Sequence, residues 1–177
     1  MRAAGLLRRG GLVAHQTGTL PGAAAMATSR KGVRAMQQFK QRKGPFLLLA
    51  DSQSMALSLA RFISPALRRM ARQSWPGSIT LVFPARPGLV SACYQKSQLA
   101  VRVDGNAEVR LLAKACGGLL LSSSLNRKGR QTAVPGCRYH MRHHRHLQGR
   151  IAAALASGGR ASKIISIWRN DCAIIRQ

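Results

Sequence analysis

The stretch that decides the fold is QLAVRVDGNAEVRLLAKACGGLLLSSSLN, residues 98–126. Its first six residues, 98–103, are mostly apolar and include two valines, a composition that predicts a strand. Asn106 can cap a helix over AEVRLLAKAC, and Gly117-Gly118 can end that helix. The apolar run LLLSSS, residues 119–124, then predicts a second, buried strand that ends in hydroxyl groups. A strand, a helix and another strand in this order are typical of an α/β sheet.

The same alternation continues on both sides of this stretch. Further strands are expected over residues 11–16, 46–50 and 78–85, and further helices over residues 30–41, 52–62 and 64–74. The segments KIISIW and CAIIR flank Arg169-Asn170-Asp171 and predict a terminal hairpin, which would make the sheet mixed. We therefore predict a single domain over residues 1–177, with a twisted, open, mixed α/β sheet and flanking helices.

The balance of charge is strongly basic. Lys and Arg number 29 against four acidic residues, which gives a formal charge of +25. Such a field attracts polyanions, so nucleic acid and phosphate-bearing ligands are the first partners to consider. No window reaches the roughly 18 consecutive apolar residues of a membrane span, so no membrane partner is expected.

Two features bear on the compartment. Residues 1–16, MRAAGLLRRGGLVAHQ, are Arg-rich and acid-free like a mitochondrial presequence, but they equally predict a short helix, a Gly10-Gly11 stop and the first strand. The four cysteines lie far apart without a CxxC pair, which indicates reduced thiols rather than a zinc or disulfide framework. We therefore predict a cytoplasmic protein.

Polar side chains gather at the ends of the predicted strands, where ligands collect in open α/β sheets. They are Thr17, Thr19, Lys40, Arg42, Lys43, Arg102, Ser122, Ser124 and Asn126. The sequence shows no carboxylate pair, no GxSxG elbow and no GxxxxGK[ST] loop, which argues against hydrolase chemistry and an ordinary P-loop. Cations and hydroxyls without a base suit the binding and polarising of phosphates, as in nucleotidyl transfer.

Four motifs in order, FKQRKG, SWPGSITLVFPA, LAVRV and LLLSSSLN, resemble the KxR, WPGxxT, AVRxP and SxSAN patterns of the YrdC-like threonylcarbamoyl-AMP synthases. This resemblance covers nearly the whole chain. It implies a YrdC-like fold with a concave, basic face. It also implies a nucleotidyltransferase that joins L-threonine, bicarbonate and ATP into threonylcarbamoyl-AMP and pyrophosphate. The product would serve the threonylcarbamoyladenosine modification of tRNA, with the tRNA-modification machinery as partner.

The resemblance also implies a role for individual residues. The catalytic pair would be Lys40 and Arg42, which match the KxR and would hold the triphosphate. ATP would also contact Ser124, Asn126 and Arg176, and Mg²⁺ would neutralise the triphosphate. L-Threonine would be surrounded by Thr17, Arg102, Ser122 and Ser162, with Arg102 as the partner of its carboxylate. No protein-bound metal site is implied.

The first motif of the family departs from its usual form, approximately YPTExxYGLG, because this chain reads HQTGTLPGAA. Thr17 and Gly22 remain, whereas Gly18 stands at the Glu position and Pro21 at the second Tyr position. An alternative therefore stays open. On that interpretation the fold persists without synthesis, and the basic face binds tRNA or double-stranded RNA through its phosphates.

A segment rich in histidine and arginine, residues 138–146, has no counterpart in these motifs. Its four histidines suggest a metal site, but the interleaved arginines would repel a dication. A solvated basic segment that touches phosphate is the preferred interpretation.

Overall fold

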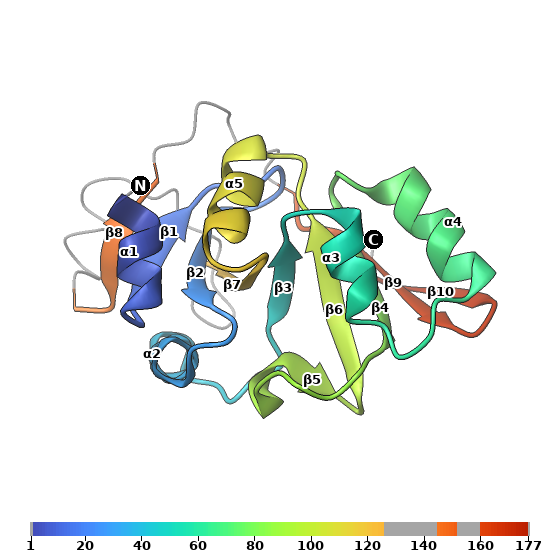
Figure 1. Ribbon diagram of the computed structural model, residues 1–177, viewed down its shortest axis with the longest axis horizontal. Helices are drawn as coiled ribbons and strands as arrows, with labels where there is room; N and C mark the ends of the chain where they lie inside the picture. Colours follow the sequence, from blue (N-terminus) through green and yellow to red (C-terminus); the bar gives the residue numbers. More distant parts are fainter. Residues whose placement is uncertain (1, 126–144, 152–159, 177) are drawn as a thin grey trace.

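The computed structural model describes residues 2–125, 145–151 and 160–176, and one mixed sheet runs through them (Figure 1). The strands are β1 (Leu12–His15), β2 (Gly22–Met26), β3 (Leu47–Ala50), β4 (Ile79–Pro84), β5 (Tyr94–Gln95), β6 (Gln98–Val103), β7 (Leu119–Ser124), β8 (Leu147–Arg150), β9 (Lys163–Trp168) and β10 (Asp171–Arg176). The helices are α1 (Arg2–Arg8), α2 (Arg30–Lys40), α3 (Gln53–Ser58), α4 (Pro65–Ser74) and α5 (Ala107–Ala115), with a 3₁₀ turn η1 at Ser91–Cys93.

The order of strands across the sheet is β10-β9-β4-β6-β3-β7-β2-β1-β8, and β5 pairs with β6. Parallel pairs join β3 to β6, β4 to β9 and β1 to β8, whereas the other pairs are antiparallel. The expected terminal hairpin is present, since β9 and β10 pair with Asp171 opposite Trp168. The prediction of a mixed α/β sheet with flanking helices is therefore confirmed.

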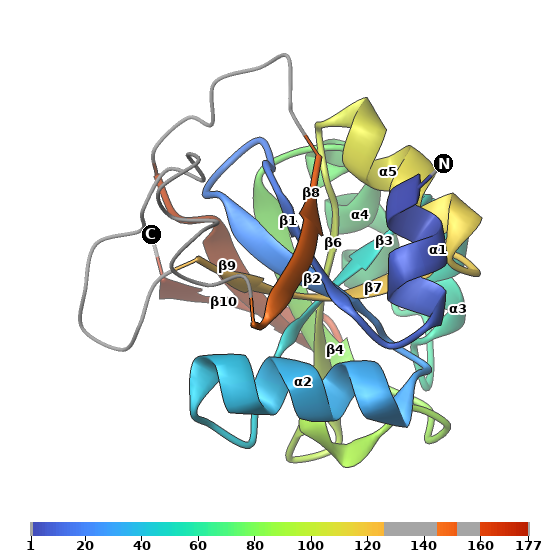
Figure 2. The same cartoon turned by 90° about the vertical axis from the view of Figure 1, so that its left-hand side faces the viewer.

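Two apolar clusters cover the two faces of the sheet. Leu48 belongs to the larger cluster and Leu49 to the smaller, because successive residues of a strand point to opposite faces. The larger cluster includes residues of α2, α3 and α4, and the smaller one packs α1 and α5 against β1, β2, β3 and β7. Figure 2 shows α1 and α5 together at one side of the strands and α2 below them.

Hydrogen bonds from nearby side chains and glycine conformations set the helix ends. The Ser29, Ser52 and Ser64 side chains each accept a hydrogen bond from a backbone N–H of the helix that follows. Asn106 caps α5 by accepting from Glu108 N at 2.9 Å. At the other end of α5, Gly117 has φ of 84° and Gly118 of 93°, a conformation that glycine adopts without strain.

Two expectations were wrong. The helix opened by Ser52 ends at Ser58 instead of Phe62, because Arg61 N donates to Pro84 O and Arg86 N donates to Leu59 O. Through these bonds the chain after Ser58 is attached to the end of β4, so these backbone groups are not available to extend the helix. The prediction also contained no strand between the first strand and the first long helix, yet GAAAM forms β2, buried between β1 and β7. Alanine carries little strand preference, so the sheet around it decides this conformation.

Candidate functional site

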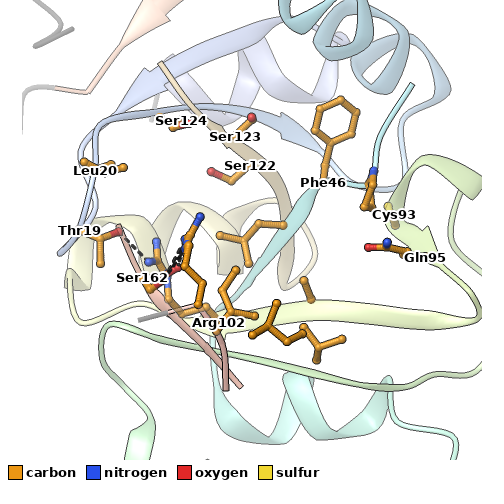
Figure 3. A pocket seen from close by; sticks show the side chains of 18 of the residues that line it. Thr19, Leu20, Phe46, Cys93, Gln95, Arg102, Ser122, Ser123, Ser124 and Ser162 are labelled. Atoms are coloured by element: carbon orange, nitrogen blue, oxygen red, sulfur yellow. Dashed lines mark hydrogen bonds between the residues drawn. The ribbon is translucent and has the colours of Figure 1, made fainter. Parts of the chain in front are cut away.

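A cavity of about 510 Å³ opens on the same face of the sheet as α1 and α5, over strands that these two helices leave uncovered (Figure 3). Gln98, Ala100 and Arg102 alternate along β6 and line it together, so the floor follows one face of that strand. The polar residues that line the cavity are Thr17, Thr19, Arg42, Gln95, Lys96, Gln98, Arg102, Ser122, Ser123, Ser124, Ser162 and Arg176. None of the lining residues within the described ranges is Asp or Glu.

Arg102 is the most deeply placed cation of the cavity, with 2% of its surface exposed. Its Nη2 lies 2.8 Å from Asp104 Oδ2, and its Nη1 donates to Thr19 Oγ1 at 2.7 Å. Burial lowers the pKa of the Arg102 guanidinium, and the charge of Asp104 opposes this shift. The carboxylate of Asp104 therefore compensates much of the cost of burying this charge.

Asp104 also holds the loop between β1 and β2. Its Oδ1 accepts from Gly18 N and from Asn106 N, each at 2.9 Å. Gly18 stands at the Glu position of the family motif, and the carboxylate that accepts from its backbone N–H belongs to Asp104, directly after β6. Asp104 thereby ties the loop, β6 and the start of α5 into one rigid unit.

The hydroxyls beside Arg102 form a directed chain. Thr17 Oγ1 donates to Leu20 O at 2.8 Å, so its single proton is in use. The Thr19 hydroxyl, 2.9 Å away, must therefore donate to Thr17, while it accepts from Arg102. The chain runs from Arg102 through Thr19 and Thr17 to a backbone carbonyl, which fixes the guanidinium and both threonines.

Ser162 and Arg176 form the wall on the side of β9 and β10. Arg176 donates from Nη2 to Ser162 O at 2.8 Å and to Ser162 Oγ at 3.2 Å. The Thr80 hydroxyl donates to Ser162 Oγ at 3.0 Å. Ser162 is thus held from two strands, and Figure 3 shows it close to Arg102 and Thr19.

Lys40 and Arg42 lie where α2 ends and the chain turns toward β3. Gln41 between them adopts φ of 51° and caps the helix in the left-handed conformation. Lys40 Nζ donates to Ser124 O at 2.8 Å, and partial burial together with the charge of Arg42 lowers the pKa of Lys40 to about 8. The exposed Arg42 guanidinium lies 4.7 Å from the centre of the Phe46 ring.

The structure brings most of the predicted site residues to one cavity. Thr17, Arg42, Arg102, Ser122, Ser124, Ser162 and Arg176 line it. Lys40 reaches it through its bond to Ser124, Lys43 is exposed outside the lining, and Asn126 lies outside the described residues. The ligands assigned to these residues stay predictions.

The sequence prediction missed two buried residues that organise the site, His15 and Asp104. Asp104 follows the end of β6 and lies two positions after Arg102, a spacing that puts both side chains on one face of an extended chain and could have identified the pair. His15 Nε2 lies 3.1 Å from Ser122 Oγ, a contact across 107 residues that no sequence pattern indicates.

The remaining predictions concern metals, thiols and the membrane. Within the described ranges, no three His, Cys, Asp or Glu side chains gather as a metal site would require. Most of segment 138–146 lies outside those ranges, although the His146 ring packs 5.9 Å from that of Phe39.

Cys93, Cys116 and Cys172 are free thiols. The helices that the structure describes include none with the length and apolar character needed to cross a membrane.

Comparison with known proteins places this fold and cavity in a family. The Sua5/YciO/YrdC family model, described as "Telomere recombination", matches residues 5–177, and the chain therefore belongs to this family. It is 36% identical over 135 residues to the threonylcarbamoyl-AMP synthase of Chromohalobacter salexigens, covering 72% of this chain and 71% of that protein. It is 32% identical over 130 residues to the enzyme of that name from Neisseria gonorrhoeae, covering 71% and 68%.

Solved structures show the same fold. The Sua5 protein of P. abyssi in complex with L-threonine superposes with a TM-score of 0.88 at 24% identity. The match covers 99% of this chain and 52% of that one, so this chain spans about half of that Sua5 protein. The names of the relatives favour the synthase over the RNA-binding alternative.

Proposed function

We propose that this chain is a threonylcarbamoyl-AMP synthase, a nucleotidyltransferase that converts L-threonine, bicarbonate and ATP into threonylcarbamoyl-AMP, pyrophosphate and water. The observation that carries the proposal is the convergence of Arg42, Arg102 and Arg176 with serine and threonine hydroxyls on one cavity, to which the described residues contribute no carboxylate. Such a site attracts the anionic groups of all three substrates and lacks the acid–base pair of a hydrolase.

Arg102 would receive the carboxylate of L-threonine. The network of Asp104 and Thr19 fixes its guanidinium before any ligand arrives, and its Nε has no hydrogen-bond partner among the described residues. Rigid placement of a donor lowers the entropy cost of binding. Thr17, Ser122 and Ser162 would complete the threonine site through their hydroxyls.

Lys40 and Arg42 would hold the phosphates of ATP, with Arg176 on the opposite wall. During nucleotidyl transfer, negative charge grows on the α-phosphate and on the departing pyrophosphate. Fixed cations at those positions stabilise this charge, an effect that typically amounts to about 100- to 1,000-fold in rate for one donor. Ser124, whose carbonyl is fixed by Lys40, and Asn126 would contact the rest of the nucleotide.

Mg²⁺ would enter as part of the nucleotide substrate. No Asp or Glu within the described ranges lines the cavity, so this part of the lining offers no carboxylate ligand of the kind that magnesium prefers. Phosphate oxygens and water would carry the ion. The product would be passed to the machinery that modifies tRNA, and a cytoplasmic location stays a prediction.

The test is pyrophosphate release from ATP with L-threonine and bicarbonate, with each of the two omitted in turn. We expect release that needs both, and a fall of about 100-fold in kcat/KM in Arg42→Ala. Arg69→Ala, which removes an exposed arginine of α4 remote from the cavity lining, is the matched control and should retain full activity. A folded protein without threonine-dependent release would overturn the proposal, and steeply salt-dependent RNA binding would then support the alternative.

A further inference from the structure

Two glutamines of the cavity, Gln95 and Gln98, have no part in the proposed roles. Both line the cavity, and they lie opposite each other where β5 pairs with β6. Gln98 shares one face of β6 with Arg102, and residues opposite each other in paired strands point to the same side of the sheet. Both amides therefore extend from the sheet toward the cavity. Figure 3 shows Gln95 beside Cys93, at the side of the cavity away from Thr19.

The hairpin that carries these glutamines is held in place. Lys96 and Ser97 form its two-residue loop with φ of 48° and 62°, and such a loop fixes which residues lie opposite each other. Ser97 O accepts from Ala85 N at 3.0 Å, and Tyr94 Oη donates to Arg86 O at 2.7 Å. The left-handed conformation is unfavourable for residues other than glycine, so the surrounding structure must impose it. The backbone that carries the two amides is thereby fixed before a ligand arrives.

Neither side-chain amide has a hydrogen-bond partner among the described residues. Each offers one oxygen that accepts and two N–H groups that donate, whereas the arginines of the lining can only donate. The glutamine pair therefore adds acceptors to this part of the cavity. Gln98 is half-buried and Gln95 is exposed, so a ligand gains more by pairing with Gln98, which water reaches less freely.

The floor between Gln98 and Arg102 consists of small apolar side chains. Ala100 lies between them on β6 and opposite Val82 of β4, and both of these residues line the cavity and are half-buried. Four residues of an extended strand span about 13 Å, so Gln98 is well separated from the cation at the buried end. The nearby Cys93 thiol stays uncharged at neutral pH, because burial raises its pKa to about 12. An apolar surface bordered by amides suits a planar, uncharged ring.

Phosphate and the purine bases differ in what they offer to such an amide. Phosphate oxygens only accept, so they leave the amide oxygens unused. Adenine presents its N6 amino group beside the N7 acceptor, and a glutamine amide matches this pair with two hydrogen bonds. Guanine presents two acceptors, O6 and N7, on the same edge, and its O6 would face the amide oxygen. The glutamine pair therefore favours adenine over guanine and over phosphate alone.

We infer that Gln98 determines the specificity for the nucleotide base, with its amide bound to the amino edge of an adenine that lies over Ala100 and Val82, and with Gln95 as a second contact. That this nucleotide is a substrate rests on the proposed function. Its selection by base does not, because binding can be measured without turnover.

The first experiment compares the binding of ATP, GTP and inorganic triphosphate by isothermal titration calorimetry. We expect the wild type to bind ATP about 10- to 100-fold more tightly than GTP, the range for one well-paired base edge. Gln98→Leu keeps the size of the side chain without its amide, so the affinity for ATP should fall about 10-fold and that for inorganic triphosphate should not change. Gln95→Leu should weaken ATP binding about 2- to 4-fold, because an exposed amide is already well hydrated. Gln73→Leu, at an exposed glutamine of α4 outside the cavity lining, is the matched control and should bind like the wild type.

The second experiment reverses the donor and acceptor pattern at this position. Gln98→Arg places two donors where guanine has two acceptors. The added charge strengthens the binding of both triphosphates, so the ratio of the ATP and GTP affinities isolates the contribution of the base. We expect this ratio to fall by about 10-fold or more in Gln98→Arg and to stay constant in Gln73→Arg. A ratio that does not change in Gln98→Arg would contradict the inference, since a merely structural role of Gln98 gives that result.

The remaining outcomes separate the base specificity from the proposed function. Equal binding of ATP and GTP by the wild type would overturn the base specificity. Equal losses of ATP and inorganic triphosphate binding in Gln98→Leu would also overturn it, because the amide would then contact phosphate. A folded wild type that binds no nucleotide would overturn both. Base-selective binding without threonine-dependent release of pyrophosphate would contradict the proposed function alone.

Discussion

The cavity has two basic ends that are built in different ways. At the buried end, Arg102 is closed in by Asp104 and Thr19, and the loop around Gly18 is tied to the same carboxylate. At the open end, Lys40 and Arg42 follow the last turn of α2, where Lys40 is half-buried and Arg42 is exposed against the ring of Phe46. Both ends present positive charge, but Arg102 is paired with a carboxylate, whereas Lys40 donates to a neutral carbonyl and Arg42 lies against an aromatic ring.

The difference follows from the cost of removing a charge from water. A buried guanidinium without a partner is strongly destabilising, so the fold supplies one and the geometry becomes fixed. The more exposed Arg42 carries a smaller cost, although partial burial still lowers the pKa of its guanidinium. We therefore expect substitutions at the buried end to act first on stability, and substitutions at the open end to act first on catalysis.

The largest effect is expected for Asp104→Asn. This change keeps the shape of the side chain but leaves Arg102 buried without a counter-charge, which should lower the free energy of unfolding by about 3–5 kcal/mol. Urea denaturation measures the loss. The exposed Asp171→Asn is the matched control and should stay within about 0.5 kcal/mol of the wild type. If Asp104→Asn were as stable as Asp171→Asn, the buried end of the cavity would not have the special importance for stability that distinguishes it from the open end.

The next effect is the acid sensitivity that His15 adds to the buried end. Its pKa in the folded protein is about 4, below the value of about 6.5 in an unfolded chain, so between these values the unfolded state binds the proton first. Stability should therefore fall as pH drops from about 6.5 toward 4, by about 3 kcal/mol in total. Denaturation curves across this range should show a flatter profile in His15→Phe. If the stability of the wild type and of His15→Phe changed with pH in the same way, the acid sensitivity would not come from His15.

A smaller effect is expected at the open end from the titration of Lys40. Since its pKa is lowered to about 8, Lys40 loses its charge as pH rises through that value, and the attraction for triphosphate weakens. We expect kcat/KM for ATP to fall about 5-fold between pH 7.5 and 9.5, the equivalent of about 1 kcal/mol. Lys40→Arg keeps its charge in this range and should be insensitive to it. A fall of the same size in that variant would assign the titration to another group.

The smallest effect is the stability change in Arg42→Ala. Loss of an exposed contact to the Phe46 ring should lower the free energy of unfolding by about 0.5–1 kcal/mol. Thermal denaturation beside Arg69→Ala separates this small loss from the large loss of catalysis. A destabilisation as large as that of Asp104→Asn would show that both ends are structural.

Local chemistry made much of the fold predictable. Serine caps, the Asn106 cap and the glycine pair after α5 mark helix ends by hydrogen bonds within a few residues, so the sequence contains both partners. The apolar runs of β3 and β7 likewise predict buried strands. The helix after Ser52 was expected to be too long, because its true end depends on bonds to β4 that lie more than twenty residues away.

The candidate site likewise combines features that depend on local sequence with features that depend on long-range contacts. The sequence by itself determined the residue types, the basic charge and the motif order, and these were sufficient to predict the family and most of the polar side chains that line the cavity. Only the tertiary structure decided that β2 lies between β1 and β7, that Arg102 pairs with Asp104 and Thr19, and that His15 meets Ser122. The physical reason is that burial and long-range hydrogen bonds depend on which strands become neighbours, and a run such as GAAAM has no local preference that specifies its neighbours.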